Sequence, residues 1–197
     1  MATDGLPDEL VVAIRDTYLP AGMTVTDAAV CERESAEYGA CRFGLDGKAI
    51  VFRVAKTTPT KIGQFVTLWK RPSPGDPIAP LDISDDVDLI VVSVSDETQR
   101  GQFVFDRAVL AAKDIMSAGG QGGKRAIRVY PPWTRPIAKL AMQTQQWQLR
   151  YFFSIPQDGA ADSVQLCKLF HGDGLDKHRV PSRAVEATNP RRLLTPD

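Results

Sequence analysis

Apolar residues in the first forty positions recur at helical spacing in two segments. The segment PDELVVAIRDTY, residues 7–18, starts with a proline suited to a first helical turn, then has acids at the positive helix end and apolar residues three and four apart. Thr26 or Asp27 is a suitable N-cap for a second helix that runs to Tyr38 and ends before Gly39. The pattern therefore predicts two N-terminal helices.

From residue 41 onward the pattern changes to short runs of β-formers separated by turn residues. CRFGL and KAIVFRV flank Asp46-Gly47, a strong signal for a two-residue hairpin turn. KTTPTKIG is predicted to be a polar loop, because Pro59 is incompatible with a central strand. Three further strands are predicted, at residues 63–71, 87–95 and 101–106. The second of these is the most apolar, and we expect it to be buried on both faces.

Helix and strand patterns alternate in the next fifty residues. We predict a helix at 107–117, a Gly-rich loop, a strand at 125–133 and a long helix at 137–153. The long helix has five residues that can share an inward face: Ile137, Leu140, Ala141, Trp147 and Tyr151. Its glutamines have two interpretations, a set of groups that contact base edges or an exposed polar face: Gln143, Gln145, Gln146 and Gln148.

The order of these elements predicts the fold class. We expect an antiparallel meander from Phe65 to Phe105, then a crossover helix and a strand parallel to the sheet. The result is an α/β fold with a mixed sheet, helices packed on it, N-terminal helices and an added β-hairpin. Residues 1–156 are predicted to form a single domain. Residues 157–197 are polar and dotted with Pro and Gly, and we expect a poorly ordered tail with a short turn at SVQLCKLF.

Composition adds the class of protein. The 197 residues are 43% apolar and 24% charged, as in an ordinary globular domain. No apolar run approaches the roughly 18 residues that span a bilayer, and the first ten residues are acidic, unlike a signal peptide. These features predict a cytoplasmic protein without membrane contact. The three cysteines have no CxxC spacing, so we expect reduced thiols.

The net charge of zero hides blocks of one sign. Residues 47–75 carry six bases and no acid, residues 76–98 carry seven acids and no base, and residues 100–150 carry nine bases and two acids. Such blocks predict a surface with a basic face and an acidic face, and a basic face favours partners that carry phosphate.

Two basic stretches are candidates for contact with nucleic acid. The first has cations, hydroxyls and an amide that can contact phosphates: Arg53, Lys56, Thr57, Thr58, Lys61, Gln64, Lys70 and Arg71. Trp69 lies within it and can stack on a base or belong to the core. The second combines cations with aromatic rings: Lys124, Arg125, Arg128, Tyr130, Trp133 and Arg135. Arg128 and Tyr130 share one face of their strand. The alternative for both stretches is a solvated basic surface.

The acidic segment from Asp82 to Asp88 precedes the most apolar strand. Carboxylates at a strand end can bind Mg²⁺ for hydrolysis, and the following strand brings Gln102 and Asp106. Asp88 is the candidate metal ligand, and Asp88 and Gln102 are the candidate catalytic residues. The alternatives are a surface loop and a contact for a basic protein partner. No cofactor other than Mg²⁺ is indicated.

Several strings in the chain resemble the MepB-like family of bacterial proteins, over residues 38–153. They are FRVAKTTPTKIGQFVTLWKR, DLIVVSV, GQFVF, GKRAIRVYPPW and TQQWQLRYF. The family is similar in fold to the restriction-endonuclease, or PD-(D/E)XK, group. That resemblance implies that Asp88 is the metal-binding acid, and that Gln102-Phe103-Val104 stands where those nucleases have an acid-x-Lys triplet. The lysine is missing, unless Lys56 or Lys70 replaces it, so efficient cleavage is not expected.

Together these features predict a DNA- or RNA-binding protein on a degenerate endonuclease-like fold, which binds the phosphate backbone in a basic cleft. The alternatives are a metal-dependent nuclease with an atypical active site and a non-enzymatic protein-interaction module.

Overall fold

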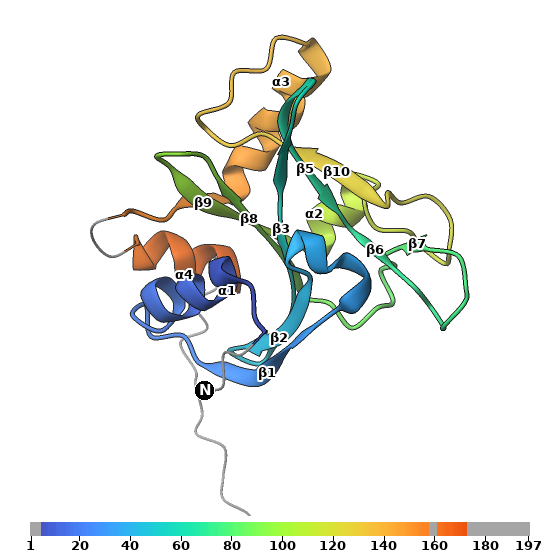
Figure 1. Ribbon diagram of the computed structural model, residues 1–197, viewed down its shortest axis with the longest axis horizontal. Helices are drawn as coiled ribbons and strands as arrows, with labels where there is room; N and C mark the ends of the chain where they lie inside the picture. The colour runs from blue at the N-terminus through green and yellow to red at the C-terminus, as the bar shows by residue number, and fades with distance from the viewer. Residues whose placement is uncertain (1–4, 158–160, 173–197) are drawn as a thin grey trace, which may run out of the picture.

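A large mixed sheet forms the centre of the molecule, with structure on both of its faces (Figure 1). The computed structural model describes residues 5–157 and 161–172. In spatial order the large sheet consists of β1 (Val25–Cys31), β2 (Cys41–Leu45), β3 (Lys48–Val54), β8 (Leu89–Ser95), β9 (Arg100–Asp106) and β11 (Phe152–Ser154). β3 and β8 are parallel, and the other neighbours are antiparallel. The predicted α/β class with a mixed sheet is confirmed.

The first predicted helix is present, and the second is wrong. α1 (Asp8–Ala13) continues as the π-helix η1 (Ile14–Tyr18), and together they cover one face of the large sheet. Residues 25–31 form edge strand β1 instead of a helix, and only η2 (Arg33–Tyr38) is helical, as a 3-10 segment. Pairing of β1 with β2 accounts for the difference, because β-branched residues accept either conformation and tertiary contacts decide between them.

The predicted hairpin between β2 and β3 is confirmed. Asp46 and Gly47 have φ angles of 49° and 76°, the left-handed values that a type I′ turn needs at both central positions. Five residue pairs connect the two strands, from Cys41↔Phe52 to Leu45↔Lys48. β8 is buried along its length up to the exposed Ser95, as its apolar sequence predicts.

The predicted meander from Phe65 to Phe105 is wrong, because this part of the chain divides between two sheets. The partner of β8 on one side is β3, not the strand that immediately precedes it in sequence. The KTTPTKIG segment is a hairpin, not a loop, with Pro59 in its turn. A small antiparallel sheet has the order β10 (Ala126–Val129), β5 (Lys61–Thr67) and β4 (Lys56–Thr58). β10 is therefore antiparallel to β5 and lies outside the large sheet, contrary to the parallel strand predicted there.

The small sheet covers one face of β8 and β9, whose apolar side chains are buried on both faces. Val66 and Val129 of the small sheet, and Leu68 just after β5, pack with α2 (Arg107–Ala112) against the face opposite α1. A two-stranded ribbon, β6 (Trp69–Lys70) with β7 (Ala79–Pro80), extends from the same layer.

The long C-terminal helix is shorter and less buried than its pattern predicts. α3 (Lys139–Gln148) is followed by the 3-10 turn η3 (Leu149–Tyr151). Trp147 packs on Phe105, as expected for the inward face. Ile137 and Leu140 are instead 85% and 76% exposed, since α3 projects from the end of the fold and only its last turns reach the core.

Within the tail predicted to be poorly ordered, the short turn expected at SVQLCKLF is a full helix packed on the core. α4 (Ser163–His171) is capped by the Asp162 carboxylate and lies beside α1 (Figure 1). Leu166 and Phe170 are 0% and 2% exposed, and the Phe170 ring contacts the Tyr18 ring edge-on at 5.4 Å between centroids. The domain therefore includes this helix. The rest of the predicted tail, 158–160 and 173–197, lies outside the described residues. No helix in the described ranges is long and apolar enough to cross a membrane.

Candidate nucleic-acid interface

The outer face of the small sheet brings the two predicted basic stretches together. Alternation along β5 and β10 sends Val66 and Val129 into the core, so that neighbouring residues face outward. Lys56 pairs with Phe65, and Phe65 pairs with Arg128 on its other side. These three residues from β4, β5 and β10 therefore form one row across the sheet, with a cation at each end.

Aromatic rings lie between the cations of this row. The Arg128 guanidinium carbon is 5.9 Å from the centre of the Phe65 ring, and Lys56 Nζ is 5.1 Å from the centre of the Tyr38 ring. The Tyr38 and Phe65 rings contact each other edge-on at 6.0 Å. Lys56 Nζ is also 3.8 Å from a carboxylate oxygen of Glu37, so its charge is partly neutralised. The strongest free positive charge must come from other residues.

Arg128 fixes the tip of the β4–β5 hairpin. Its guanidinium donates to the carbonyl oxygens of Lys61 at 3.2 Å and Gly63 at 2.9 Å, and to Thr58 Oγ1 at 3.0 Å. Gly63 has a φ of 83°, and an added Cβ there would lie 2.7 Å from the Tyr130 ring. The hairpin tip is therefore held against β10, and it presents the exposed Lys61 side chain beside it.

A groove of about 850 Å³ continues from this face between β10 and α3. We call it the β10–α3 groove. Of its described lining residues none is acidic, and the polar and aromatic ones are Lys113, Lys124, Arg128, Tyr130, Gln143, Thr144, Trp147 and Gln148. Lys113 Nζ lies 5.5 Å from the centre of the Trp147 ring. Arg125 is exposed next to Lys124. The groove thus concentrates positive charge that has no carboxylate in its walls.

The Gln148 side-chain amide lines this groove and makes the hydrogen bonds that a neighbouring strand would make with β10. Its side chain is 1% exposed; Oε1 accepts from the Tyr130 N–H at 2.9 Å, and Nε2 donates to the Arg128 carbonyl at 3.0 Å. The amide therefore completes the free edge of β10 and joins α3 to it. The sequence showed only a glutamine-rich helix, and the exposed face expected for its glutamines is wrong at this position.

Several residues of the first predicted stretch lie away from this surface. Arg53 is 0% exposed, and its Nη2 donates to Glu32 Oε2 at 2.6 Å. Gln64 is buried and donates to the Ser95 carbonyl at 2.6 Å, and the exposed Thr57 hydroxyl lies beside it at 3.4 Å. These side chains support the fold between the two sheets.

Three further candidates serve internal contacts. Lys70 pairs with Asp85, and Arg71 pairs with Glu34 at 2.7 Å. The Trp133 ring packs against Phe152, with centroids 5.8 Å apart, inside the core cluster that includes α2. None of the three faces the groove.

The structure does not bring Asp88 and Gln102 together. Gln102 pairs with Ser93, five residues along β8 from Asp88, a separation of about 17 Å at the rise of a β-strand. Gln102 is 0% exposed and accepts a hydrogen bond from the Tyr18 hydroxyl at 2.5 Å. Asp88 accepts from the Ala49 N–H at 2.9 Å. Within residues 5–157 and 161–172, no three His, Cys, Asp or Glu side chains gather as a metal site.

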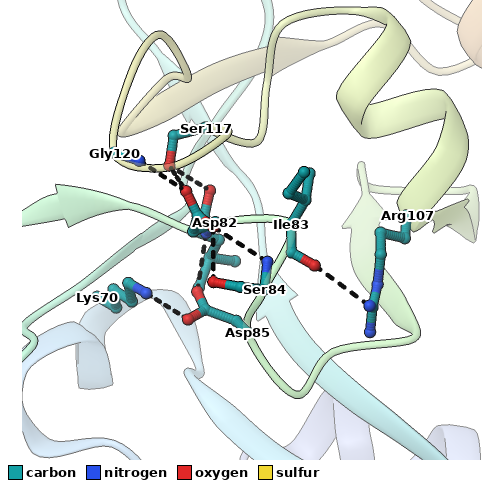
Figure 2. Close-up of polar contacts among 9 residues, drawn as sticks. Lys70, Asp82, Ile83, Ser84, Asp85, Arg107, Ser117 and Gly120 are labelled. Carbon is teal, nitrogen blue, oxygen red and sulfur yellow. Dashed lines mark hydrogen bonds and ion pairs between the residues drawn. The ribbon is translucent and has the colours of Figure 1, made fainter.

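The acidic segment is tied into the fold by its own hydrogen bonds (Figure 2). Asp82 accepts from the Gly120 N–H at 3.0 Å, from Ser84 N–H and Oγ, and from Ser117 Oγ at 2.8 Å. These bonds, with the Gly120 amide first, hold the pKa of Asp82 well below its usual range. Asp85 pairs with Lys70, and Arg107 donates to the Ile83 carbonyl (Figure 2). The Asp82 and Asp85 carboxylates therefore join this segment to the 117–120 loop and to β6, and Arg107 of α2 binds one of its backbone carbonyls.

Two groove residues could not be singled out from the sequence. Lys113 belongs to a segment predicted as helical, and nothing local distinguishes it from an ordinary solvated lysine. Gln148 was one of four candidate glutamines with equal local signals. Only the approach of α3 to β10 singles out these two residues.

Comparison with known proteins gives the family. A model of the MepB-like family matches residues 32–154. A crystal structure of MepB matches with a TM-score of 0.63 and 32% sequence identity, over 74% of this chain and 93% of that chain. A bacterial homing endonuclease matches at 14% identity over 72% of this chain and 86% of that one, and its TM-score of 0.39 is too low to support an argument. No curated protein matches the chain. The chain belongs to the MepB-like family.

Proposed function

We propose that this protein binds nucleic acid through a basic surface made of the outer face of the small sheet and the β10–α3 groove. The observation that carries the proposal is that β4, β5 and β10, from two stretches far apart in sequence, place Lys56, Phe65 and Arg128 in one row beside a groove without acidic lining among the described residues. Phosphate contacts supply most of the affinity in such a surface and make it dependent on salt.

Four cations of this surface that have no carboxylate partner among the described residues are the proposed phosphate contacts. Lys61 and Arg125 are exposed, and Lys113 and Lys124 line the groove. The Arg128 guanidinium is already hydrogen-bonded to the backbone of the hairpin tip. Its proposed role is therefore to hold Lys61 in position and not to contact phosphate itself. Tyr130 borders the groove and is the aromatic group best placed to contact a base.

The endonuclease-like ancestry of the fold is part of the same proposal. The supporting feature is Asp88 at the head of β8, which pairs antiparallel with β9. Because Asp88 and Gln102 lie at opposite ends of that strand pair, they cannot bind one Mg²⁺ ion together, and we propose binding without cleavage by this pair.

Fluorescence anisotropy with labelled single-stranded DNA, duplex DNA and RNA, at several salt concentrations, tests the proposal. We expect binding at low salt that weakens as salt rises. The double variant Lys61→Gln/Arg125→Gln removes two exposed cations whose side chains have no hydrogen-bond or ion-pair partner within residues 5–157 and 161–172. It should lower the slope of log K against log salt by about 1.8 for duplex DNA and about 1.4 for a single strand.

A matched control distinguishes binding through this surface from an effect of the protein's net charge. Lys48→Gln/Arg150→Gln also removes two cations, which line a different pocket beside α4. The control variant should keep the wild-type slope. Absence of binding at low salt, or equal loss in both double variants, would contradict the proposal.

The two alternatives make different predictions. A nuclease would cut DNA or RNA with Mg²⁺, and Asp88→Asn would abolish the cutting. A protein-interaction module would bind a basic partner through Asp86, which is exposed in the acidic segment, and would not bind nucleic acid.

A further inference from the structure

Cys31 and Cys41 lie directly opposite each other at the ends of β1 and β2. The Glu32 N–H donates to the Ala40 carbonyl at 2.7 Å, so the next pair along is a hydrogen-bonded one. Since the two kinds of pair alternate in antiparallel strands, Cys31 and Cys41 form a non-hydrogen-bonded pair, with Cα atoms about 4.5 Å apart and side chains on the same face. That separation lies within the range that a disulfide bridges.

The two thiols differ in accessibility. Cys31 is exposed, and Cys41 is fully buried. The Cys31 thiol donates to the Gly5 carbonyl at 3.5 Å, and the strand register places the Cys31 side chain directly opposite that of Cys41. A reagent in solution therefore reaches Cys31 first, and Cys41 is positioned to react with whatever forms there. Cys167 lies on α4 and has neither of these relations to them.

We propose that Cys31 and Cys41 form a reversible cross-strand disulfide by exchange with low-molecular-weight disulfides such as oxidised glutathione. The Cys31 thiolate attacks one sulfur of the reagent, and one reduced thiol leaves. The Cys41 thiolate then attacks the Cys31 sulfur of this mixed disulfide, and a second reduced thiol leaves. Two protein thiols are oxidised and one small disulfide is reduced, so electrons and protons balance.

Burial controls the second step. Burial, and then the neighbouring Cys31, raise the pKa of the Cys41 thiol. Since only the thiolate attacks, ring closure is slow near neutral pH and accelerates as pH rises.

The disulfide would constrain a segment that contacts the basic surface. Residues 32–40 lie between the two cysteines and contain η2. From η2, Tyr38 packs on Phe65 and Glu37 pairs with Lys56. Oxidation should therefore hold η2 more firmly against the small sheet, whether or not that sheet binds nucleic acid.

The test uses the full chain, reduced and then incubated in buffers of fixed oxidised-to-reduced glutathione ratio. Remaining thiols are alkylated in acid, and the protein is cleaved with trypsin. Cleavage after Arg33 places the two cysteines in different peptides, so a disulfide appears as a linked pair that lacks the mass of two hydrogen atoms. We expect two of the three thiols to be lost, with Cys167 still alkylated and full recovery on reduction.

Variants and a second readout make the result decisive. Cys167→Ser should leave the linked pair unchanged, and Cys31→Ser should abolish it. Hydrogen exchange of residues 33–38 should slow on oxidation. A stable mixed disulfide on Cys31 with Cys41 free, a link that uses Cys167, three unreacted thiols, or unchanged exchange in η2 would each overturn the proposal.

Discussion

The ion pair between Glu32 and Arg53 gives the sharpest test of how this fold uses its charges. Arg53 was a candidate phosphate contact in the sequence, but its side chain is 0% exposed and lies 2.6 Å from Glu32. Glu32 is 29% exposed and also contacts Arg42 at 2.8 Å. The two partners therefore differ in what remains when the other is removed. A buried guanidinium without its carboxylate is costly, whereas a half-exposed carboxylate that keeps Arg42 is not.

This difference predicts an asymmetry between two variants. Glu32→Gln should lower the free energy of unfolding by about 3 kcal/mol. This is the lower end of the cost of breaking a buried ion pair, and it applies because Glu32 is partly hydrated. In a chain of this size that corresponds to a fall in melting temperature of about 6 to 12 °C. Arg53→Met keeps most of the volume and removes the buried charge, so it should cost about 1 kcal/mol or less.

Urea denaturation followed by circular dichroism measures both variants and the double variant. The double variant should be more stable than Glu32→Gln alone, since no unpaired charge remains in it. Strictly additive losses, or a larger loss for Arg53→Met than for Glu32→Gln, would refute the reasoning. Arg53→Met should also keep the salt dependence of nucleic-acid binding, and a reduced slope in a folded protein would return Arg53 to the binding surface.

Three further predictions concern other parts of the fold. Phe170→Ala should destabilise the protein by about 3 to 5 kcal/mol in thermal denaturation, because α4 belongs to the core, whereas Val164→Ala on the exposed side of α4 should have little effect. Gln148→Ala leaves two β10 edge groups without partners, and it should cost about 2 kcal/mol in urea denaturation and weaken nucleic-acid binding. The folded-state pKa of Asp82 is lowered, chiefly by the Gly120 amide, so its stabilisation is present above the unfolded pKa of about 3.9 and is lost as pH falls. Asp82→Asn should therefore show a smaller drop in melting temperature than the wild type between about pH 5 and pH 2.

The sequence by itself determined the elements whose signals are local. Asp46-Gly47 specifies a type I′ turn through its backbone preferences, and the flanking β-formers complete the hairpin. The apolar run at 89–94 is enough to indicate a strand buried on both faces, without knowledge of its neighbouring strands. The blocks of charge did not locate the basic face, because Arg53, Lys70 and Arg71 of the 47–75 block pair with carboxylates.

The tertiary structure decided everything that depends on which strand pairs with which. β3 pairs with β8, so the intervening hairpin is free to form a second sheet with β10, and the two basic stretches meet there. The same pairing buries Arg53 and Gln102 and places Asp88 at the opposite end of its strand pair from Gln102. A charged or amide side chain has the same local signal whether it is solvated, paired in the core or poised in a groove. Only long-range register distinguishes these environments, and register is not contained in any short stretch of sequence.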